Sequence, residues 1–507
     1  MSFRVIGRGI ALSVFALALM GGAPARGGDP DLQELRNEMR ELRNELHRTL
    51  SEKQKRIEEL ERQVQSLQTT SKPAEQAKSA DAGPGPSTSG QSALEKALSG
   101  IEQYQEQTRK GELASRPLGG GATVRLMDIS LDVLFNAGSS TEGDKQIELL
   151  QGGGHDPHRR GFTLSQAEIG LVGAIDPYFT AESYIVFTEE GVELEEAYFK
   201  SSSLPAGLQL KGGFFLTEFG IINQTHPHSW DWIDQPIINT RLFGGDGTRG
   251  PGARLSWLTP LPWYSEIYVG MQNANNETMV SFLGSRENVG VDVPSGAITI
   301  GGRPLEEREV TRMGDFLYLA RWENSFDLSK EVTTKFGFSG LFGPNNTGAD
   351  GYTTIYGADM KMKWRPVSNE KGWPFLVWQS EIMARDYRAD TIRVDGSPSV
   401  MLPEATLHDW GVYTQLLYGF HPHWSAGLRF EYASGDEASK LVFDSRAQDP
   451  FRDNRYRVSP ILTWYSSEFM RFRLQYNYDL PDHLDREAHS IWLGTEFLIG
   501  AHPAHKY

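Results

Sequence analysis

The stretch Tyr356-Gly-Ala-Asp-Met-Lys-Met-Lys-Trp364 alternates apolar and polar side chains residue by residue. Successive side chains of a β-strand point to opposite faces of the sheet, so this alternation predicts a strand with two unlike faces. One face would carry Tyr356, Ala358, Met360, Met362 and Trp364, and the other Gly357, Asp359, Lys361 and Lys363. An apolar, aromatic face opposite a charged one is what a barrel wall between lipid and a wet interior requires.

The same alternation recurs along the C-terminal three quarters of the chain. Arg429 and Glu431 oppose aromatic and aliphatic neighbours, as do Arg471 and Arg473. About sixteen such segments can be counted, the first within 124–135 and the last within 489–499, and single-chain bacterial barrels prefer an even number. We therefore predict an all-β transmembrane barrel of about 16 antiparallel strands over residues 122–507, with an N-terminal α-helical coiled coil ahead of it. A barrel of this size should enclose an aqueous channel rather than a filled core.

A soluble sandwich of two sheets would show the same alternation with its polar face outside. The many segments, the Tyr and Trp at their ends and the N-terminal leader described next favour the membrane.

Residues 1–25 combine two arginines, an apolar run and Ala23-Pro24-Ala25, which is typical of a cleaved signal peptide. The run is shorter than the roughly 18 residues of a spanning helix. We predict export to the bacterial outer membrane, with the N-terminal region in the periplasm.

Residues 30–69 predict a periplasmic coiled coil, because apolar residues recur at steps of three and four. Lys53 interrupts the seam. Such a helix needs a partner for its apolar stripe, so we expect self-association, with a homo-trimer as the working hypothesis and an intramolecular helical hairpin as the alternative. Peptidoglycan or a periplasmic protein are further candidate partners. Residues 70–121 are rich in Ala, Ser, Gly and Pro and predict a linker with one short helix.

The composition excludes several classes of protein. The chain of 507 residues has no cysteine, which rules out disulfides, thiol nucleophiles and Cys-ligated zinc. A formal charge of -16 argues against a nucleic-acid partner, since phosphate binding needs basic surface. Mean hydropathy is -0.44, which a barrel with one lipid-facing side tolerates. No catalytic arrangement can be identified from spacing, and we expect no enzyme.

One long segment departs from the strand pattern. It runs Thr225-His-Pro-His-Ser-Trp-Asp-Trp-Ile-Asp-Gln-Pro236 and continues through 239–258. It resembles the bacterial family labelled zinc-regulated TonB-dependent outer membrane receptors, whose His-containing C-terminus is similar to residues 501–507. The resemblance covers the predicted barrel. This sequence contains no TonB box or plug that we can identify, so we expect a porin-like barrel. Through the coiled coil and sixteen strands, the chain more weakly resembles phosphate-selective porins.

Residues 221–251 are too long and too aromatic for a hairpin turn, and long barrel loops can fold inward to narrow a pore. We predict a constriction segment here, with candidate residues Trp230, Trp232, Arg241, Asp246 and Arg249. The candidate pore-lining residues on the strands are Asp359, Lys361, Lys363, Arg429, Glu431, Arg471 and Arg473.

Zinc is the only cofactor that the pattern suggests. His226 and His228 offer imidazole ligands, and Asp231 and Asp234 offer carboxylates close by in sequence. The alternative is a loop stiffened by Pro227 whose histidines only form hydrogen bonds. Histidine pairs also occur at 155 and 158, at 421 and 423, and at 502 and 505.

Two further motifs have simpler interpretations. Residues 244–252 are glycine-rich without the Lys and Ser or Thr of a phosphate loop, which predicts a tight turn. Five glutamates around Gly191 predict a solvated acidic hairpin, with divalent-cation binding as the alternative.

Three functions remain. A porin-like channel for passive passage of ions or small solutes is the favoured hypothesis, because charged strand faces set ion preference. The alternatives are a zinc-linked receptor or uptake pore, and a structural tether of the envelope with the barrel as its anchor.

Overall fold

The computed structural model of this protein describes residues 115–118, 122–125, 127–284, 299–300, 303–305, 308–394, 400–436, 452–484 and 486–500. The predicted signal peptide, the coiled coil, the short linker helix and the C-terminal histidines lie outside these residues.

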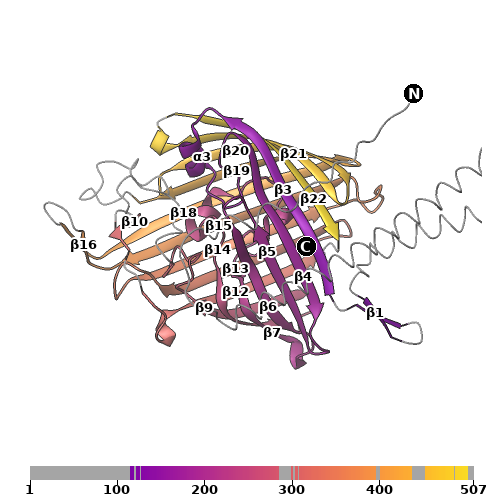
Figure 1. Ribbon diagram of the computed structural model, residues 1–507, viewed down its shortest axis with the longest axis horizontal. Helices are drawn as coiled ribbons and strands as arrows, with labels where there is room; N and C mark the ends of the chain where they lie inside the picture. Colours follow the sequence, from indigo (N-terminus) through magenta and orange to yellow (C-terminus); the bar gives the residue numbers. More distant parts are fainter. Residues whose placement is uncertain are drawn as a thin grey trace, which may run out of the picture. The chain divides into compact units, whose positions relative to one another are not determined.

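Sixteen strands form one closed antiparallel barrel, as the alternation predicted. In chain order they are β3 (Met127–Ser140), β4 (Gly161–Ala174), β5 (Phe179–Phe187), β6 (Val192–Ser201), β7 (Leu208–Leu216), β8 (Arg249–Leu258), β9 (Tyr264–Asn273), β12 (Phe316–Asp327), β13 (Val332–Pro344), β14 (Tyr352–Trp364), β15 (Phe375–Ala389), β18 (Ala405–His421), β19 (Trp424–Gly435), β20 (Arg455–Ser467), β21 (Met470–Pro481) and β22 (Ala488–Gly500). Pairing of β22 with β3 closes the ring, whose tilted strands are seen in Figure 1.

Short elements occupy the rest of the described chain. β1 (Ser115–Leu118) pairs with β2 (Ala122–Arg125), so the first barrel strand begins at Met127 rather than at residue 122, where the sequence prediction had placed the start of the barrel. β10 (Thr299–Ile300) pairs with β11 (Arg303–Pro304), and β16 (Ile392–Val394) with β17 (Val400–Leu402). The helices are α3 (Asp144–Leu150), α4 (Ile237–Phe243) and the 3₁₀ turns η2 (Pro205–Gly207), η3 (Pro227–Ser229), η5 (Met313–Asp315) and η7 (Asp482–Leu484). No helix in this part of the chain has the length and hydropathy needed to cross a membrane.

The two faces of the wall have opposite character. On β14 the side chain of Tyr356 is 48% exposed on the outside, whereas Asp359 is 5% exposed and faces the interior. On β19, Phe430 is exposed and Arg429 is buried. The predicted alternation is thus confirmed, with apolar and aromatic side chains outside and charged ones inside.

The two ends of the barrel differ in their connections. At one end, which we call the short-turn end, strands are joined by tight connections such as 175–178 and 422–423. Met127 and Gly500, the outer bounds of the barrel, also lie at this end because β3 and β22 are antiparallel. The other end, the long-loop end, carries α3, β10 and β16, which are seen in the left half of Figure 1.

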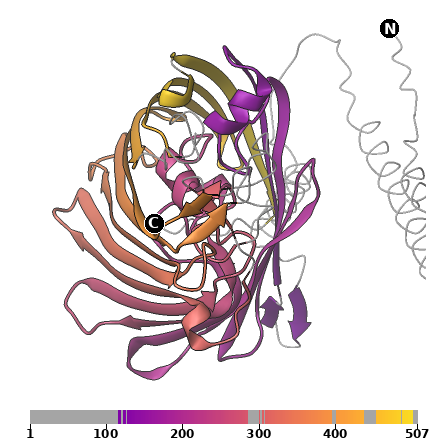
Figure 2. The ribbon, with the colours of Figure 1, turned by 90° about the vertical axis from the view of Figure 1, so that its left-hand side faces the viewer.

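Residues 217–248, between β7 and β8, fold into the barrel instead of extending outward. We call them the inserted segment. Figure 2 shows this magenta part of the chain, with α4, inside the ring of strands. Its side chains and backbone bond to inward-facing groups on strands far from β7 and β8, such as Glu431 on β19 and Gln475 on β21.

An apolar core occupies the interior toward the long-loop end. Three parts of the chain supply it: the inserted segment, the connection after β9, and inward-facing residues of β12 to β18. Its members are Phe219, Ile222, Trp230, Ile238, Leu242, Phe243, Ala274, Met279, Phe282, Leu283, Leu317, Leu319, Leu341, Ile355, Met383 and Tyr413. The sequence-based expectation of a fully aqueous channel is therefore incorrect for this half, because the chain folds its own apolar residues into the lumen.

The other half of the interior contains a cavity of ≈ 1210 Å³. Its wall includes residues near the short-turn end of the strands, among them Glu182, Tyr264 and Lys363. Its inner boundary is the inserted segment, including His226 and Trp230. The barrel interior thus divides into a packed half and a polar, hollow half.

Candidate functional site in the barrel interior

Asp234 is the main polar anchor of the inserted segment. Oδ2 accepts hydrogen bonds from Arg457 at 2.9 Å and Asn477 at 2.7 Å, and Oδ1 accepts one from Gln475 at 2.7 Å and another from Arg429. Burial alone would raise the pKa of Asp234, but Arg429 and Arg457 lower it to about 2. A buried carboxylate matched by two guanidinium groups stays ionised, so this contact ties the segment to β19, β20 and β21.

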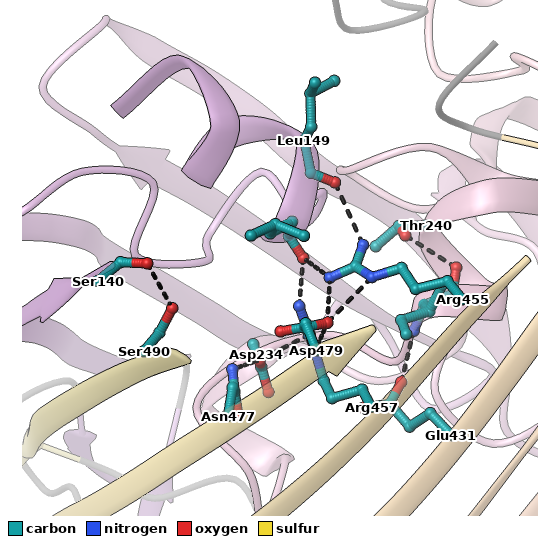
Figure 3. Close-up of polar contacts among 12 residues, drawn as sticks. Ser140, Leu149, Asp234, Thr240, Glu431, Arg455, Arg457, Asn477, Asp479 and Ser490 are labelled. Carbon is teal, nitrogen blue, oxygen red and sulfur yellow. Dashed lines mark hydrogen bonds and ion pairs between the residues drawn. The ribbon is translucent and has the colours of Figure 1, made fainter. Parts of the chain in front are cut away.

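The same arginine cluster reaches α3 at the long-loop end. Arg455 donates at 2.7 Å to Asp479 and also at 3.2 Å to the carbonyl of Leu149, as Figure 3 shows. Arg457 donates at 2.8 Å to the same carboxylate of Asp479 and also to the Leu150 carbonyl. These bonds satisfy carbonyls at the end of a short helix, and they connect α3 to the wall.

Further backbone groups of the inserted segment bond to the wall. Arg471 donates at 2.6 Å to the carbonyl of His228, and Arg473 donates at 3.1 Å to that of Trp232. The indole N–H of Trp232 donates at 2.9 Å to the carbonyl of Ser459. The first backbone N–H of α4, on Ile237, donates at 2.7 Å to Glu431. The segment is therefore held along its length and not only at one point.

His226 and His228 lie against a group of glutamates on β4 and β6. Nδ1 of His226 lies 3.0 Å from Oε2 of Glu168 and 2.9 Å from Oε2 of Glu195, and its Nε2 lies 2.8 Å from Oε2 of Glu196. Nδ1 of His228 lies 3.6 Å from Oε2 of Glu168. Burial would lower the pKa of His226, but Glu195 and Glu168 raise it well above its usual range.

Glu168, His226 and His228 form a group that could hold a metal ion. One ligand atom from each lies within 4.8 Å of the other two. All three side chains are at least nine-tenths buried. Imidazole nitrogen with carboxylate oxygen is a donor set that suits Zn²⁺.

Two β-bulges bring these glutamates inward. In β6 the pairing with β5 shifts between Tyr184 and Ile185, which leaves one extra residue, and Glu195 and Glu196 are both buried although they are consecutive. In β4 the pairing with β3 shifts in the same way between Leu134 and Phe135. It leaves one extra residue in β4, and the consecutive residues Ser165 and Gln166 are both buried. A bulge re-aims side chains in this way because two residues oppose one on the partner strand.

The predicted pore-lining residues all lie on the inner face of the barrel, and four of the seven border the cavity. Asp359 forms an ion pair with Arg321 at 2.6 Å. Arg429, Glu431, Arg471 and Arg473 bond to the inserted segment. Lys361 and Lys363, with Arg429 and Arg471, border the cavity.

The predicted constriction residues are divided between the two halves of the interior. Trp230 and Trp232 border the cavity. Arg241 donates at 2.7 Å to the carbonyl of Asp453, toward the long-loop end. Burial raises the pKa of Asp246, and Arg249, the first residue of β8, forms ion pairs with Glu193 and Glu195. The glycine-rich run forms a turn at 244–248, where Gly244 (φ 77) follows α4 in a conformation that favours glycine.

Of the four predicted metal ligands, the structure keeps His226 and His228 together but places neither Asp231 nor Asp234 in their group. Asp234 binds the arginines, and Asp231 borders the cavity. The carboxylate that joins the histidines is Glu168, which is 58 positions away from His226 in the sequence. Local spacing carried no signal of this pairing. The other described histidine pairs contact backbone carbonyls: Nδ1 of His155 lies 3.3 Å from Ser165 O, and Nδ1 of His423 lies 2.8 Å from Tyr465 O.

Fold and site together define a 16-stranded antiparallel β-barrel with an inserted internal segment. No protein-family model matches the chain. An uncharacterized protein of Aquifex aeolicus (strain VF5) is 27% identical over 406 residues, which are 75% of this chain and 80% of that protein.

Among solved structures, the chain is similar to the outer membrane channel DcaP of Acinetobacter baumannii, at 11% identity and a TM-score of 0.47 over 74% of this chain and 97% of that one. Pseudomonas putida OprB gives 11% identity and a TM-score of 0.48 over 74% of this chain and 94% of that one. An anion-selective porin from Comamonas acidovorans gives 8% identity and a TM-score of 0.42, with 74% and 98% covered.

Proposed function

We propose that this protein is an outer-membrane channel for passive passage of ions or small solutes, narrowed by its inserted segment. The observation that carries the proposal is the closed barrel of sixteen strands whose outside is apolar and whose inside is charged and partly hollow. A wall of this polarity suits lipid on one side and water on the other. Lysines and glutamates around the cavity would give passing ions an electrostatic preference.

The two unlike ends suggest an orientation. Outer-membrane barrels carry short turns on the periplasmic side and longer loops outside. The short-turn end, where Met127 and Gly500 lie, would thus face the periplasm together with the N-terminal region. The cavity would open from that side, and α3 and the apolar core would lie toward the exterior. Self-association through the predicted coiled coil into a homo-trimer belongs to the same proposal.

Single-channel recording in planar bilayers tests the proposal. The chain has no cysteine, so one introduced thiol can be labelled without background. Lys361→Cys places a thiol at the cavity, and Lys330→Cys places one in the exposed turn after β12. A bulky thiol reagent should reduce the conductance of Lys361→Cys and leave that of Lys330→Cys unchanged.

Equal insensitivity of both variants would show that ions do not pass through the cavity. Absence of any conductance by the folded, inserted protein would overturn the channel proposal and favour the structural tether.

A further inference from the structure

The geometry points to a transition-metal site, suited to Zn²⁺, formed by Glu168, His226 and His228 with Glu195 beside them. It would link the inserted segment to the barrel wall, because the histidines belong to the segment and the glutamates to β4 and β6. Its role in holding the constriction in place rests on the proposed channel function. Its ability to bind a metal ion does not.

The ligand atoms of these side chains converge on one place. For metal bonds of about 2.0–2.1 Å in a tetrahedral site, ligand atoms lie about 3.3 Å from one another. In the structure, Nδ1 of His226 lies 3.0 Å from Oε2 of Glu168 and 2.9 Å from Oε2 of Glu195, and Nδ1 of His228 lies 3.6 Å from Oε2 of Glu168. Each of these three separations is within a few tenths of an ångström of that value, and the ligand atoms of Glu168, His226 and His228 all lie within 4.8 Å of one another.

The other ring nitrogen of His226 is held by a carboxylate. Metal-binding histidines usually donate their second N–H to a carboxylate, which fixes the ring and its tautomer. Nε2 of His226 lies 2.8 Å from Oε2 of Glu196. Glu196 is itself held in place, because its Oε1 accepts the backbone N–H of Leu216 at 2.8 Å. This arrangement directs Nδ1 of His226 toward Glu168 and Glu195.

Glu195 is buried beside the same histidine. Its side chain is 3% exposed, and its Oε2 points at Nδ1 of His226 without hydrogen-bond geometry. Two carboxylate oxygens, from Glu168 and Glu195, thus approach one ring nitrogen that carries at most one proton. A buried carboxylate oxygen needs a partner. A divalent cation between these groups would satisfy both glutamates at once.

Metal binding by the full-length protein in detergent micelles tests the inference. After treatment with a chelator and dialysis, the protein is titrated with Zn²⁺ by calorimetry and with Co²⁺ by visible absorption, which reports the coordination geometry. We expect one ion per chain, with Co²⁺ bands of a four-coordinate site. Glu168→Gln, which keeps the shape of the side chain, should weaken the binding at least about 100-fold, since it removes a ligand that bridges both histidines.

Three further variants define the site. His226→Ala combined with His228→Ala should abolish stoichiometric binding, and the heat-dependent mobility of the barrel on gels reports whether this variant folds. His421→Ala combined with His423→Ala, which removes a pair in an exposed turn, should bind one ion like the parent. Glu196→Gln should weaken binding about 10- to 100-fold, as expected for a residue that orients a ligand.

Failure of the metal inference and failure of the channel proposal are distinguishable. Absence of stoichiometric Zn²⁺ in the parent, or equal binding by Glu168→Gln, would overturn the metal site and leave an ion-pair network of histidines and glutamates. Conductance recorded with and without Zn²⁺ then tests whether metal binding affects the channel. Zn²⁺ should reduce the conductance of the parent and not that of Glu168→Gln, whereas tight Zn²⁺ binding without any conductance would overturn the channel alone.

Discussion

The guanidinium group of Arg457 on β20 lies 2.9 Å from Oδ2 of Asp234 on the inserted segment, and both side chains are fully buried. Nothing in the local sequence links these two residues, which lie 223 positions apart. Through this pair, the charged inner wall holds the segment that fills the barrel. We make four predictions from the buried contacts of the barrel interior and from the charges around the cavity.

The first concerns Asp234. Asp234→Asn removes the charge that Arg429 and Arg457 share, and loss of one partner of a buried pair destabilises by about 3–5 kcal/mol. We expect a looser inserted segment, seen as higher and noisier single-channel conductance and a lower unfolding temperature in micelles. Asp231→Asn is the matched control, because Asp231 borders the cavity three residues earlier. Equal behaviour of the two variants would show that the arginine contacts do not hold the segment.

The second concerns the apolar core. Phe243 is fully buried, and its ring meets that of Phe219 at a centroid distance of 5.2 Å. Phe243→Ala should cost about 3–5 kcal/mol and open the long-loop half of the interior. Conductance should rise. Phe420→Ala, on the exposed outer face of β18, should leave conductance at the parental value. An unchanged Phe243→Ala channel would place the conducting path away from this core.

The third concerns pH. Burial is the main cause that raises the pKa of Asp156 to about 7, and the negative charge of Asp234 adds to it. Hydrogen bonds from the backbone N–H groups of Gln235 and Gly153 lower the pKa, but they do not outweigh these effects. Below about pH 4 both folded and unfolded Asp156 are protonated, whereas between about pH 4 and 7 only the folded form keeps its proton. The free energy of unfolding should therefore fall across this window, by a few kcal/mol.

Urea unfolding in micelles at several pH values measures this effect. The midpoint of the parent minus that of Asp156→Asn should decrease as the pH rises from 4 to 7, because only the parent titrates at this position. Taking the difference between the two midpoints removes the effect of all other titrating groups, which the two proteins share. A difference that is constant with pH would show that Asp156 is ionised throughout.

The fourth concerns ion preference. Lys361 and Lys363 border the cavity near the short-turn end. Each positive charge at about 8 Å from a passing ion in water contributes roughly 0.5 kcal/mol, about a twofold change in preference. Replacing both with Gln should increase the ratio of cation to anion permeability, measured from reversal potentials in a salt gradient. Lys330→Gln in the exposed turn should not. A ratio unaffected by the double change would exclude these lysines from the conducting path.

The barrel could be predicted from sequence because its signal is local. In stretches such as Tyr356–Trp364, the polarity of the side chains changes from each residue to the next. That alternation is enough to predict the strands, the character of their two faces and their approximate number. Inward folding of residues 221–251 was also predicted, because their length and aromatic content do not suit a turn. Both inferences depend on residues that are near one another in the chain.

The contents of the lumen could not be predicted in the same way. Leu317 and Ile355 face the interior, where the alternation would have placed polar residues, because they meet the inserted segment there. The partner of His226 is Glu168 and not the nearby Asp231 or Asp234, since closure of the barrel decides which distant strand faces the segment. Bulges obscure the pattern further, as two consecutive buried residues interrupt an alternating signal.

The bulge in β6 shows how such a wall can gain a functional group. Glu193 and Glu195 share one parity along the strand and both pair with Arg249. Glu196, Tyr198 and Lys200 share the other parity and border the cavity, so the bulge lets both sets of side chains reach the interior. Deleting either Glu195 or Glu196 would therefore restore strict alternation and leave every flanking side chain on its present face. One extra residue in the strand thus adds one carboxylate to the lumen while the lipid-facing surface keeps its composition.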